Sequence, residues 1–369
     1  MKLLKDNKIS FIIPSFEYGG AEKNLINLAN YFHKKKYKTE FLVINDKGPM
    51  KSFLEPGINV INFNKSKSSY AIFKLLKYFF KNQPSYHFSS IRNLNILSLI
   101  CSFISFKKFK IIIRESNVIS DLNYKKNSYT YKIYRFLSKY LYPYSFKIIA
   151  VSSAVKNSMI NELGINKDLI LTINNPINFD EISRKMNHPI SHKFINNKNK
   201  IILSIGSLTK QKNHALLLKS FELVLKKENA FLIIIGEGEE KIKLLDICKK
   251  LNISKFVDFY GTTDNPYFFL KNCDLFVLPS LWEGFPNVLL EAIACKSKII
   301  ATNCEGGSYE ILNNYKFGTI VKNNDLDELT DKIIKKLADN SIIDDYKFNY
   351  KIDEFSIDNQ FGKYEKIIK

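Results

Sequence analysis

The sequence predicts an α/β protein built from two doubly wound domains, and three observations support this prediction. Short apolar runs alternate with amphipathic segments of helical period along most of the chain. A polar stretch rich in Asn and Lys, residues 177–200, interrupts the alternation, which then restarts. The chain has 369 residues, more than one ordinary hydrophobic core accommodates. We therefore expect a linker near the middle of the chain and a sheet on each side of it.

The first domain is predicted over residues 1–180. Its apolar runs are predicted as strands at residues 8–16, 38–45, 58–63, 111–117 and 146–152. Helical spacing of apolar residues predicts helices at 21–36 and 69–83. The long apolar run 94–106 is predicted as a buried helix, because a membrane-spanning helix needs about 20 apolar residues.

The second domain is predicted over residues 181–350. Its strands are expected at residues 200–208, 230–238, 255–261, 274–280, 297–303 and 318–323. Helices are expected at 214–227 and 240–251. The remainder, 351–369, is predicted as a C-terminal helix that packs back on the first domain.

The charge of the chain predicts an acidic partner. Lys and Arg outnumber Asp and Glu by 56 to 36, a formal net charge of +20. Such an excess suits nucleic acid, anionic lipid or a phosphorylated substrate. A lysine-rich composition bias with no specific partner is the alternative interpretation. Because the sequence contains no recognisable RNA- or DNA-binding motif, we expect no nucleic-acid partner.

The five cysteines are scattered, with no paired short spacing. This argues against a zinc site or a disulfide framework and indicates a reducing, cytoplasmic environment. The N-terminal segment has too short an apolar run, interrupted by charge, to be a signal peptide.

Glycines follow the predicted strands in both halves. Gly19 and Gly20 follow the first strand, and Gly206, Gly236 and Gly261 follow strands of the second domain. Glycine lets a backbone approach a phosphate or a sugar closely. Ligands of such sheets bind at the carboxyl ends of the strands, so we expect the ligand site in a cleft between the two domains.

The stretch LWEGFPNVLLEA places a glutamate on each side of an apolar run, Glu283 and Glu291. Pro286 suits the first turn of a helix, where its missing N–H costs nothing. Glu283 then lies in the loop before this helix, and Glu291 lies in its second turn. The helix N-terminus between them offers free N–H groups to a phosphate. The alternative is an ordinary strand–loop–helix unit with two incidental glutamates.

Several segments together resemble the family 4 retaining glycosyltransferases, which have the GT-B fold of two Rossmann-like domains facing a central cleft. The segment LPSLWEGFPNVLLEAIACKSKIIATNCEGGSYEIL resembles their donor site, whose hallmark is two glutamates separated by seven residues. FEYGGAEKNLINLAN resembles their N-terminal loop and helix. IGSLTKQKNHALLLKSF and VDFYGTTDNPYFFLKNCDLFVLPS follow in the family's order.

The resemblance implies roles for individual residues. Glu291 would bind the ribose hydroxyls of a nucleotide sugar, Glu283 would contact the donor sugar near the reacting carbon, and Lys212 would neutralise the diphosphate leaving group. Gly20 would approach the diphosphate from the first domain. The remaining donor-binding positions implied by the resemblance are Ser207, Thr262, Thr263, Gly284, Phe285, Pro286, Asn287, Val288 and Leu289.

The chain departs from the family pattern at two places. Ser207 stands where many members have an arginine, so one cationic contact to the diphosphate is missing. Lys210 is a candidate substitute, and the alternative is a weaker hydrogen bond donated by Ser207 itself. Arg114 and Glu115 stand where many members have a histidine. The resemblance then favours a reaction in which the leaving phosphate takes the acceptor's proton. In an alternative, Glu115 orients the acceptor hydroxyl.

We expect no metal ion and no cofactor besides the nucleotide sugar as co-substrate. The carboxylate pair Asp325 and Asp327 is predicted to start a helix rather than to bind a metal.

The predicted helix at 69–83 interleaves Lys74, Lys77 and Lys81 with apolar residues, a pattern that can lie on an anionic membrane or pack on the sheet. Relatives of this kind build bacterial surface polysaccharide or lipid-linked oligosaccharide. The resemblance therefore implies a retaining glycosyltransferase that uses a nucleotide sugar, expected to be UDP-linked. Its expected acceptor is a polyprenyl-diphosphate-linked glycan at the inner face of the cytoplasmic membrane. The alternatives are a GT-B synthase with a soluble acceptor and a non-catalytic basic lipid- or nucleic-acid-binding protein.

Overall fold

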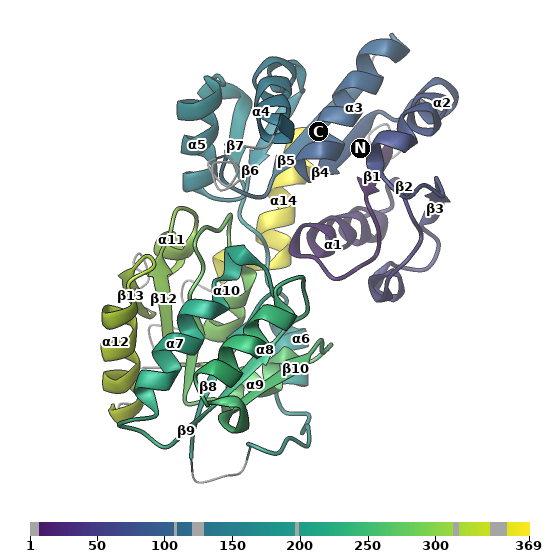
Figure 1. Ribbon diagram of the computed structural model, residues 1–369. Helices are drawn as coiled ribbons and strands as arrows, with labels where there is room; N and C mark the ends of the chain where they lie inside the picture. The colour runs from purple at the N-terminus through teal and green to yellow at the C-terminus, as the bar shows by residue number, and fades with distance from the viewer. Residues whose placement is uncertain (1–6, 107–108, 120–128, 196–198, 313–316, 340–352) are drawn as a thin grey trace. The chain divides into compact units, whose positions relative to one another are not determined.

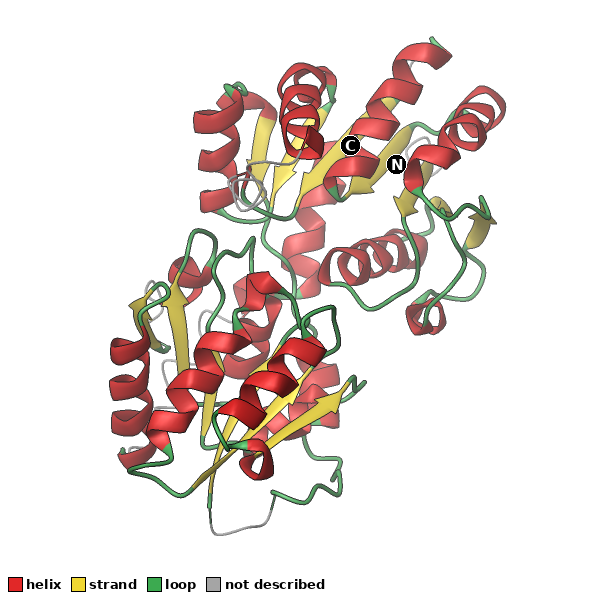
Figure 2. Cartoon of the chain, in the orientation of Figure 1, coloured by secondary structure: helices red, strands yellow, loops and turns green. Residues whose placement is uncertain are grey.

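A computed structural model of the chain describes residues 7–106, 109–119, 129–195, 199–312, 317–339 and 353–369. The chain divides into two compact units: unit 1 is Met1–Pro176 with Ile357–Lys369, and unit 2 is Ile177–Ser356. In each unit, helices cover both faces of a parallel sheet (Figures 1 and 2). The doubly wound α/β fold predicted from the sequence is confirmed.

The sheet of unit 1 has seven strands in the order β3-β2-β1-β4-β5-β6-β7, and every neighbouring pair is parallel. Its strands are β1 (Lys8–Ile13), β2 (Lys38–Val43), β3 (Asn59–Asn62), β4 (Tyr86–Ser90), β5 (Lys110–Glu115), β6 (Lys147–Ala150) and β7 (Ile170–Thr172). Its helices are α1 (Gly20–Lys34), α2 (Ile72–Asn82), α3 (Arg92–Ser105), α4 (Tyr129–Leu141), α5 (Ser153–Leu163) and α14 (Ile357–Ile368).

A row of stacked phenylalanines crosses the centre of this sheet. Phe11 lies opposite both Phe41 and Phe88 in the strand register, with ring centroids 6.1 Å and 5.1 Å away. All three side chains are buried. Side chains paired across neighbouring strands in this way stabilise a sheet, and each aromatic ring adds a large buried apolar area.

The C-terminal helix α14 packs into the same core. Phe361 meets the Tyr31 ring of α1 at 5.6 Å, and Tyr364 meets Phe88 at 6.1 Å. The Tyr86 hydroxyl donates to the Ile368 carbonyl at 3.1 Å. The last residues of the chain therefore belong to unit 1, although residues 177–356 of unit 2 precede them in the sequence.

The sequence did not predict strand β4, although it lies in the middle of the sheet. This strand carries buried polar residues, and each has a partner: His87 Nδ1 bonds Ser10 Oγ at 2.8 Å, and His87 Nε2 bonds Ser98 Oγ at 3.1 Å. Burial lowers the pKa of His87 to about 3, so its imidazole is neutral at physiological pH. Polar residues that hydrogen-bond across the sheet conceal the apolar pattern that identifies a buried strand.

Helix α3 is buried only in part. Leu94, Leu97 and Cys101 are buried, but Phe103 and Ile104 in its last turn are each 45% exposed. The prediction of a wholly buried helix at this place is therefore wrong for the last turn. No helix in the described part of the chain is both long enough and apolar enough to cross a membrane.

The sheet of unit 2 has six parallel strands in the order β10-β9-β8-β11-β12-β13. They are β8 (Lys200–Ile205), β9 (Ala230–Ile235), β10 (Val257–Gly261), β11 (Leu275–Leu278), β12 (Ile299–Asn303) and β13 (Thr319–Lys322). The helices are α6 (Phe179–Lys185), α7 (His214–Val224), α8 (Lys241–Lys250), α9 (Pro266–Asn272), α10 (Asn287–Ala294), α11 (Ser308–Leu312) and α12 (Leu326–Ala338).

Two helices of unit 2 begin at side-chain caps, one at a position predicted from the sequence and one inside the predicted linker. Asp325 caps α12 by accepting from the Glu328 amide at 3.0 Å, which confirms that this carboxylate begins a helix. The predicted linker 177–200 contains α6, whose cap Asn178 accepts from the Glu181 amide at 3.1 Å. This short helix was not predicted, because seven residues carry too little periodicity to be recognised.

Candidate active site

The strand order of unit 2 reverses between β8 and β11, and ligands of such sheets bind at this reversal. The loops that follow these two strands are hydrogen-bonded to each other. The Leu281 amide donates to the Gln211 carbonyl at 2.8 Å, and Gln211 Nε2 donates to the Trp282 carbonyl at 2.9 Å. Ser207, Lys212 and Glu283 lie in these two loops.

Lys212 and Glu283 form an ion pair at this edge of the sheet. Lys212 Nζ donates to Glu283 Oε1 at 2.6 Å, and Ser280 Oγ donates to the same oxygen at 2.6 Å. The two charged side chains are 16% and 6% exposed, so each depends on the other for compensation of its charge. Among the described residues, no donor is bonded to Glu283 Oε2, which leaves this oxygen for a ligand.

Glycines allow the loops that follow β8, β9 and β10 to approach one another. The Gly236 amide donates to the Gly261 carbonyl at 2.7 Å, and a Cβ on Gly236 would overlap the Gly206 carbonyl. Gly236 also has φ +147°, which favours glycine. A Cβ on Gly206 would come within 3.1 Å of the Lys212 side chain. Gly206 therefore makes room for this lysine.

Helix α10 begins at Asn287, with Pro286 as its N-cap at φ −74° and ψ 100°. Pro286 thus lies just outside the helix, and the prediction that it occupies the first turn is wrong by one position. Its extended ψ is what distinguishes a cap from a helical residue. No side-chain hydrogen bond caps this helix end. Glu291 lies in the second turn, as predicted, and is half-buried.

A second loop, in which no individual residue was predicted to have a role, fixes the backbone of Glu283. The Glu283 amide donates to the Glu305 carbonyl at 2.9 Å, and the Gly307 amide donates to the Gly284 carbonyl at 2.9 Å. Gly306 has φ +136°, and a Cβ there would overlap the Glu283 carbonyl. The adjacent pair of glycines in CEGG was the signal that could have revealed this contact.

The remaining predicted donor residues lie along the same edge. Ser207 follows β8 and is exposed, as is Lys210. Thr262 follows β10 and is exposed, whereas Thr263 accepts a hydrogen bond from the Asn265 amide at 3.1 Å. The positions from Gly284 to Leu289 form the loop after β11 and the start of α10.

His214 is the histidine nearest to this site along the chain, and it is buried at the start of α7. Burial and, to a smaller extent, the Lys212 ammonium lower the pKa of His214 to about 3. Its imidazole is therefore too weak a base to take a proton from an acceptor hydroxyl at neutral pH. Within the described residues, no group of three or more His, Cys, Asp or Glu is placed to hold a metal ion. Independence from metal remains a prediction.

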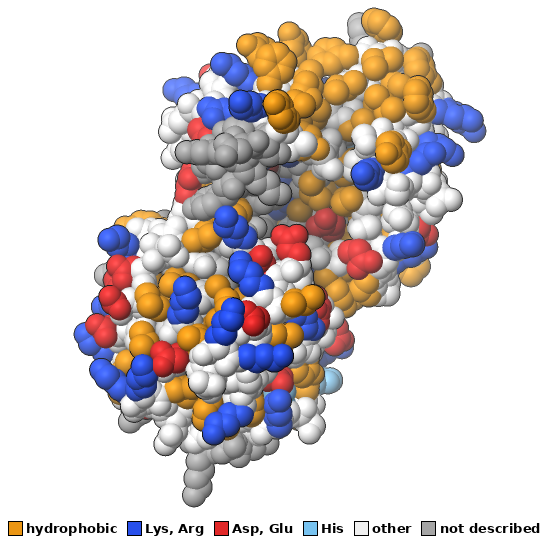
Figure 3. All heavy atoms as spheres, in the orientation of Figure 1, with side chains coloured by type: hydrophobic (Ala, Val, Ile, Leu, Met, Phe, Trp, Pro, Cys, Tyr) orange, Lys and Arg blue, Asp and Glu red, His pale blue; other side chains and the backbone are white. Residues whose placement is uncertain are grey.

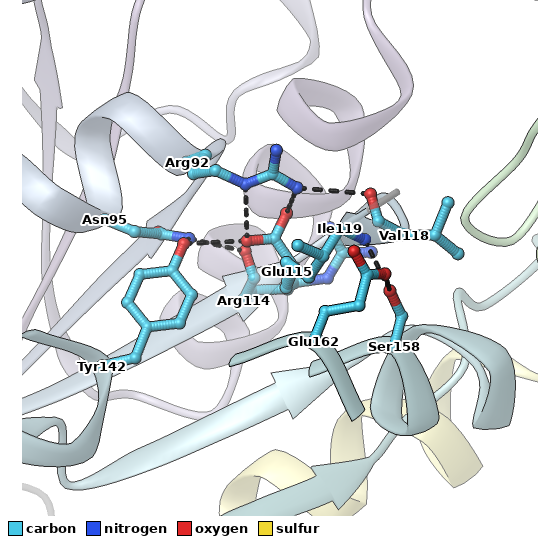
Figure 4. Close-up of polar contacts among 9 residues, drawn as sticks. All are labelled: Arg92, Asn95, Arg114, Glu115, Val118, Ile119, Tyr142, Ser158 and Glu162. Atoms are coloured by element: carbon cyan, nitrogen blue, oxygen red, sulfur yellow. Dashed lines mark hydrogen bonds and ion pairs between the residues drawn. The ribbon is translucent and has the colours of Figure 1, made fainter. Parts of the chain in front are cut away.

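In unit 1, Glu115 is part of a buried network (Figure 4). Arg92 Nη2 donates to its Oε1 at 3.1 Å, and the Tyr142 hydroxyl donates to its Oε2 at 2.8 Å. The Glu115 side chain is 2% exposed. Both of its oxygens are thus engaged with the protein, and they tie the start of α3 to the end of β5. Neither Arg92 nor Tyr142 could be identified as a partner of Glu115 from the sequence.

Arg114 is also buried and holds neighbouring segments of unit 1. It donates to Ser90 Oγ at 3.3 Å and to Asn175 Oδ1. Burial raises the pKa of Glu22 in α1, and the positive charge of Arg114 partly opposes this rise. The geometry of Arg114 is that of a structural cation.

One face of unit 1 exposes aromatic and aliphatic side chains from α2, α3 and α4, with lysines around them (Figure 3). Helices α2, α3 and α4 contain no acidic residue. We call this surface the aromatic face, and its members are Phe73, Phe80, Phe103, Ile104, Ile133, Phe136 and Tyr140. Buried Leu75 and Phe79 of α2 pack on the sheet, so only part of that helix contributes to the face.

The positive charge of the chain belongs almost entirely to unit 1. By sequence, unit 1 has 31 Lys and Arg against 12 Asp and Glu, a net charge of +19, whereas unit 2 has 25 against 24, a net charge of +1. A composition bias acting on the whole chain would charge both units. The excess of positive charge is therefore specific to unit 1.

Comparisons with known proteins agree with this geometry. Residues 189–353 match the family model described as glycosyl transferases group 1. The HepE protein of Anabaena, solved with UDP and glucose, superimposes with a TM-score of 0.78 over 98% of each chain at 19% identity. The chain is a glycosyltransferase with the GT-B fold. A non-catalytic binding protein, one of the alternatives left by the sequence, is thereby set aside.

Two curated relatives align with this glycosyltransferase along most of its length. One, from Campylobacter jejuni, is the N-acetylgalactosamine-N,N'-diacetylbacillosaminyl-diphospho-undecaprenol 4-alpha-N-acetylgalactosaminyltransferase. It is 26% identical over 360 residues, which are 92% of this chain and 93% of that enzyme. The capsular polysaccharide biosynthesis glycosyltransferase CapM of Staphylococcus aureus is 26% identical over 324 residues, which are 84% and 83% of the two chains.

A substitution at Glu115 separates a structural role from an acceptor-orienting role. Glu115→Ala leaves the buried Arg92 guanidinium without its carboxylate, so we expect the free energy of unfolding to fall by about 3–5 kcal/mol. Denaturant unfolding of the purified glycosyltransferase measures this loss. Glu55→Ala removes an exposed ion pair with Lys34 and serves as the control, with an expected loss of about 0–1 kcal/mol. Unchanged stability with abolished transfer would instead support the acceptor-orienting role.

Gly20→Ala tests whether a ligand approaches the start of α1. A Cβ at Gly20 meets nothing within 4 Å in the described structure, and alanine is the better helix former. We therefore expect unchanged or slightly higher thermal stability together with a raised KM for the sugar nucleotide or a lowered kcat. Steady-state kinetics and a melting curve on the same sample measure both. Wild-type kinetics would show that no substrate comes near this backbone.

Proposed function

We propose that this glycosyltransferase moves a sugar, a hexose or an N-acetylhexosamine, from a UDP-linked donor to a lipid-linked glycan. We further propose that the configuration at the anomeric carbon is retained. The reaction would serve the assembly of bacterial surface polysaccharide or oligosaccharide. The observation that carries the proposal is the Lys212–Glu283 pair at the strand reversal of unit 2, beside the N-terminus of α10.

The donor half of the proposal uses the charges of this edge. A nucleoside diphosphate brings negative charge, which the Lys212 ammonium and the first amides of α10 can stabilise. The Glu291 carboxylate, one turn further along α10, is assigned to the ribose hydroxyls, and Thr262 and Thr263 to the base. Relatives support the UDP assignment, since HepE of Anabaena was solved with UDP and glucose.

In the proposed reaction, the bond between the anomeric carbon and the diphosphate oxygen breaks while the acceptor oxygen bonds to that carbon on the same face. The acceptor's proton passes to the departing phosphate, so the products are a glycoside and UDP. Negative charge grows on the leaving oxygen, and we assign Lys212 to stabilise it. Glu283 Oε2 is assigned to the donor sugar. A phosphate as proton acceptor agrees with the weak basicity of His214.

The acceptor half of the proposal depends on unit 1. The Campylobacter jejuni relative is named for an undecaprenyl-diphosphate-linked acceptor, and unit 1 carries the net positive charge. We assign the aromatic face to the surface of an anionic membrane, where apolar side chains insert and surrounding lysines meet lipid phosphates. The enzyme would then be peripheral on the cytoplasmic side of the membrane. A synthase with a soluble acceptor is the competing function, and it predicts no lipid binding.

Variants of Lys212 test the donor site. Lys212→Ala should lower kcat about 100- to 1,000-fold, because it removes one preorganised donor to the leaving group. Transfer is measured with the UDP-sugar that most raises the melting temperature in a panel of nucleotide sugars. NMR of the product then gives its anomeric configuration. Lys219→Ala, an exposed lysine of α7, is the control. Full turnover by Lys212→Ala would remove the site assignment, and an inverted product would overturn the retaining mechanism.

Vesicle binding tests the membrane assignment. The double variant Phe73→Ser/Phe136→Ser should bind vesicles containing anionic phospholipid at least about tenfold more weakly than the wild type, since burying one Phe contributes about 1.5–3 kcal/mol. Co-sedimentation at low and physiological salt measures the binding. Ile242→Ser, at an 84% exposed position of unit 2, is the matched control. Absence of wild-type binding to anionic vesicles would favour the soluble acceptor.

A further inference from the structure

A cavity of about 640 Å³ opens in unit 1 where its strand order reverses between β1 and β4. Segments that follow β1, β2 and β3 form its walls together with one side of α3. Ligand cavities commonly have volumes of about 300–1,000 Å³. The described residues that line it include none of the residues assigned above to the donor or to the Glu115 network, so it is a separate site.

Three lysines line this cavity: Lys47, Lys65 and Lys67. In the part of the chain that the structure describes, none of the three forms an ion pair. Nearby Lys51, by contrast, is paired with Asp46 at 2.6 Å. Three cations that converge on one cavity without protein carboxylates as partners are suited to an anionic ligand with several oxygens.

The other polar groups of the cavity are mostly hydrogen-bond donors. Hydroxyl groups come from Ser15, Ser66 and Ser69, and the Asn93 amide donates to Ser68 Oγ at 3.2 Å. One carboxylate, that of the exposed Glu17, also lines the cavity and reduces its formal charge from +3 to +2. A diphosphate, with two linked phosphate groups, matches three ammonium groups and this set of hydroxyls better than a single carboxylate does.

The opposite wall is apolar and continues toward the aromatic face. Ile96, Leu97 and Ile100 of α3 line the cavity, and Phe103 and Ile104 are exposed on the following turn. Residues three and four positions apart lie on the same side of a helix, and one turn advances it by about 5.4 Å. The side of α3 that lines the cavity therefore leads directly to the exposed apolar surface. A ligand with an anionic head and a hydrocarbon tail can occupy both.

Helix α3 is held firmly at the end nearest the cavity. The Arg92–Glu115 ion pair fixes its first residue (Figure 4). Ile91, immediately before the helix, has φ +78° and ψ 123°, which is unfavourable for a β-branched side chain. Strained backbone of this kind concentrates at ligand sites, where the surrounding structure maintains it. The apolar wall is thus preorganised.

We infer that this cavity binds the diphosphate and the first isoprenoid units of a polyprenyl-diphosphate-linked acceptor. Lys47, Lys65 and Lys67 contact the diphosphate, and Ile96, Leu97 and Ile100 contact the hydrocarbon chain. The inference rests on the proposed lipid-linked acceptor and adds the position of its head group. The cavity-lining residues Pro14, Ser15 and Glu17 belong to the loop that leads into Gly20 at the start of α1. The diphosphate end of the acceptor would thus lie beside the segment assigned to the donor.

The test is binding of farnesyl diphosphate to the full chain by isothermal titration calorimetry, compared with farnesol and with inorganic pyrophosphate. We expect farnesyl diphosphate to bind more tightly than either. Lys65→Gln/Lys67→Gln should weaken it about tenfold or more, because each lysine contributes a charge-assisted hydrogen bond. Ile100→Ser should weaken farnesyl diphosphate but not pyrophosphate. The charge-matched control is Lys219→Gln/Lys335→Gln, two exposed lysines of unit 2.

Two results would overturn the inference. Equal affinity of the Lys65→Gln/Lys67→Gln variant and the wild type for farnesyl diphosphate would show that the ligand binds elsewhere. Pyrophosphate that binds as tightly as farnesyl diphosphate would assign the cavity to free phosphates instead of lipid. The titration requires no sugar transfer, so lysine-dependent binding without any transferase activity would contradict only the proposed function. Conversely, the Lys65→Gln/Lys67→Gln variant could transfer sugar to a lipid-linked acceptor with the same acceptor KM as the wild type. That result would contradict only the cavity assignment.

Discussion

The winding of the two parallel sheets is the constraint on which the functional geometry depends. Every parallel strand brings its carboxyl end to the same edge of its sheet, and each sheet reverses its strand order once. At such a reversal the helices that follow two neighbouring strands lie on opposite faces, and ligands commonly bind beside the loops that lead into them. In unit 2 the Lys212–Glu283 pair lies at this position. In unit 1 the lysine-lined cavity beside α3 lies there.

The Lys212–Glu283 pair is easier to explain by chemistry than by stability. Removing two charges from water costs several kcal/mol per ion, and apolar replacements for such pairs are often as stable. Here the chain maintains the pair with several specific features: Ser280 bonds the carboxylate, Gly206 makes room for the lysine, and Gly306 allows close approach to the Glu283 backbone. A bound diphosphate would share the lysine with Glu283. The two side chains are therefore held in place without a substrate, and in the proposed reaction this preorganisation would lower the cost of stabilising charge in the transition state.

The sequence was sufficient to predict the fold class and all six strands of unit 2, because fully buried parallel strands form continuous apolar runs. It was insufficient where polar residues are buried with partners. Strand β4 was missed because His87, Ser89 and Ser90 interrupt its apolar run, although each of them is hydrogen-bonded in the core. Glu115 was considered for an acceptor role because it stands where many family members have a histidine. Its partner Arg92, 23 residues earlier, could not be identified without the fold. Long-range pairing of charges leaves no local pattern.

The two units differ in how their charge is distributed, and the proposed function would use each in a different way to bind phosphate. Lysines of unit 2 are matched by carboxylates in number, and many pair within a helix turn, as Lys226 does with Glu222 and Lys250 with Asp246. Such a unit has little long-range field, so under the proposed function it would select a soluble sugar nucleotide through a few placed groups. Unit 1 has the unbalanced charge, and a field of this kind attracts extended anionic surfaces over about a Debye length, ~8 Å at physiological salt. A substrate confined to a membrane cannot diffuse into a site from all directions. An enzyme that uses one must first be brought to the surface and oriented there. Under the proposed function, this requirement would account for the excess charge in the unit that bears the aromatic face.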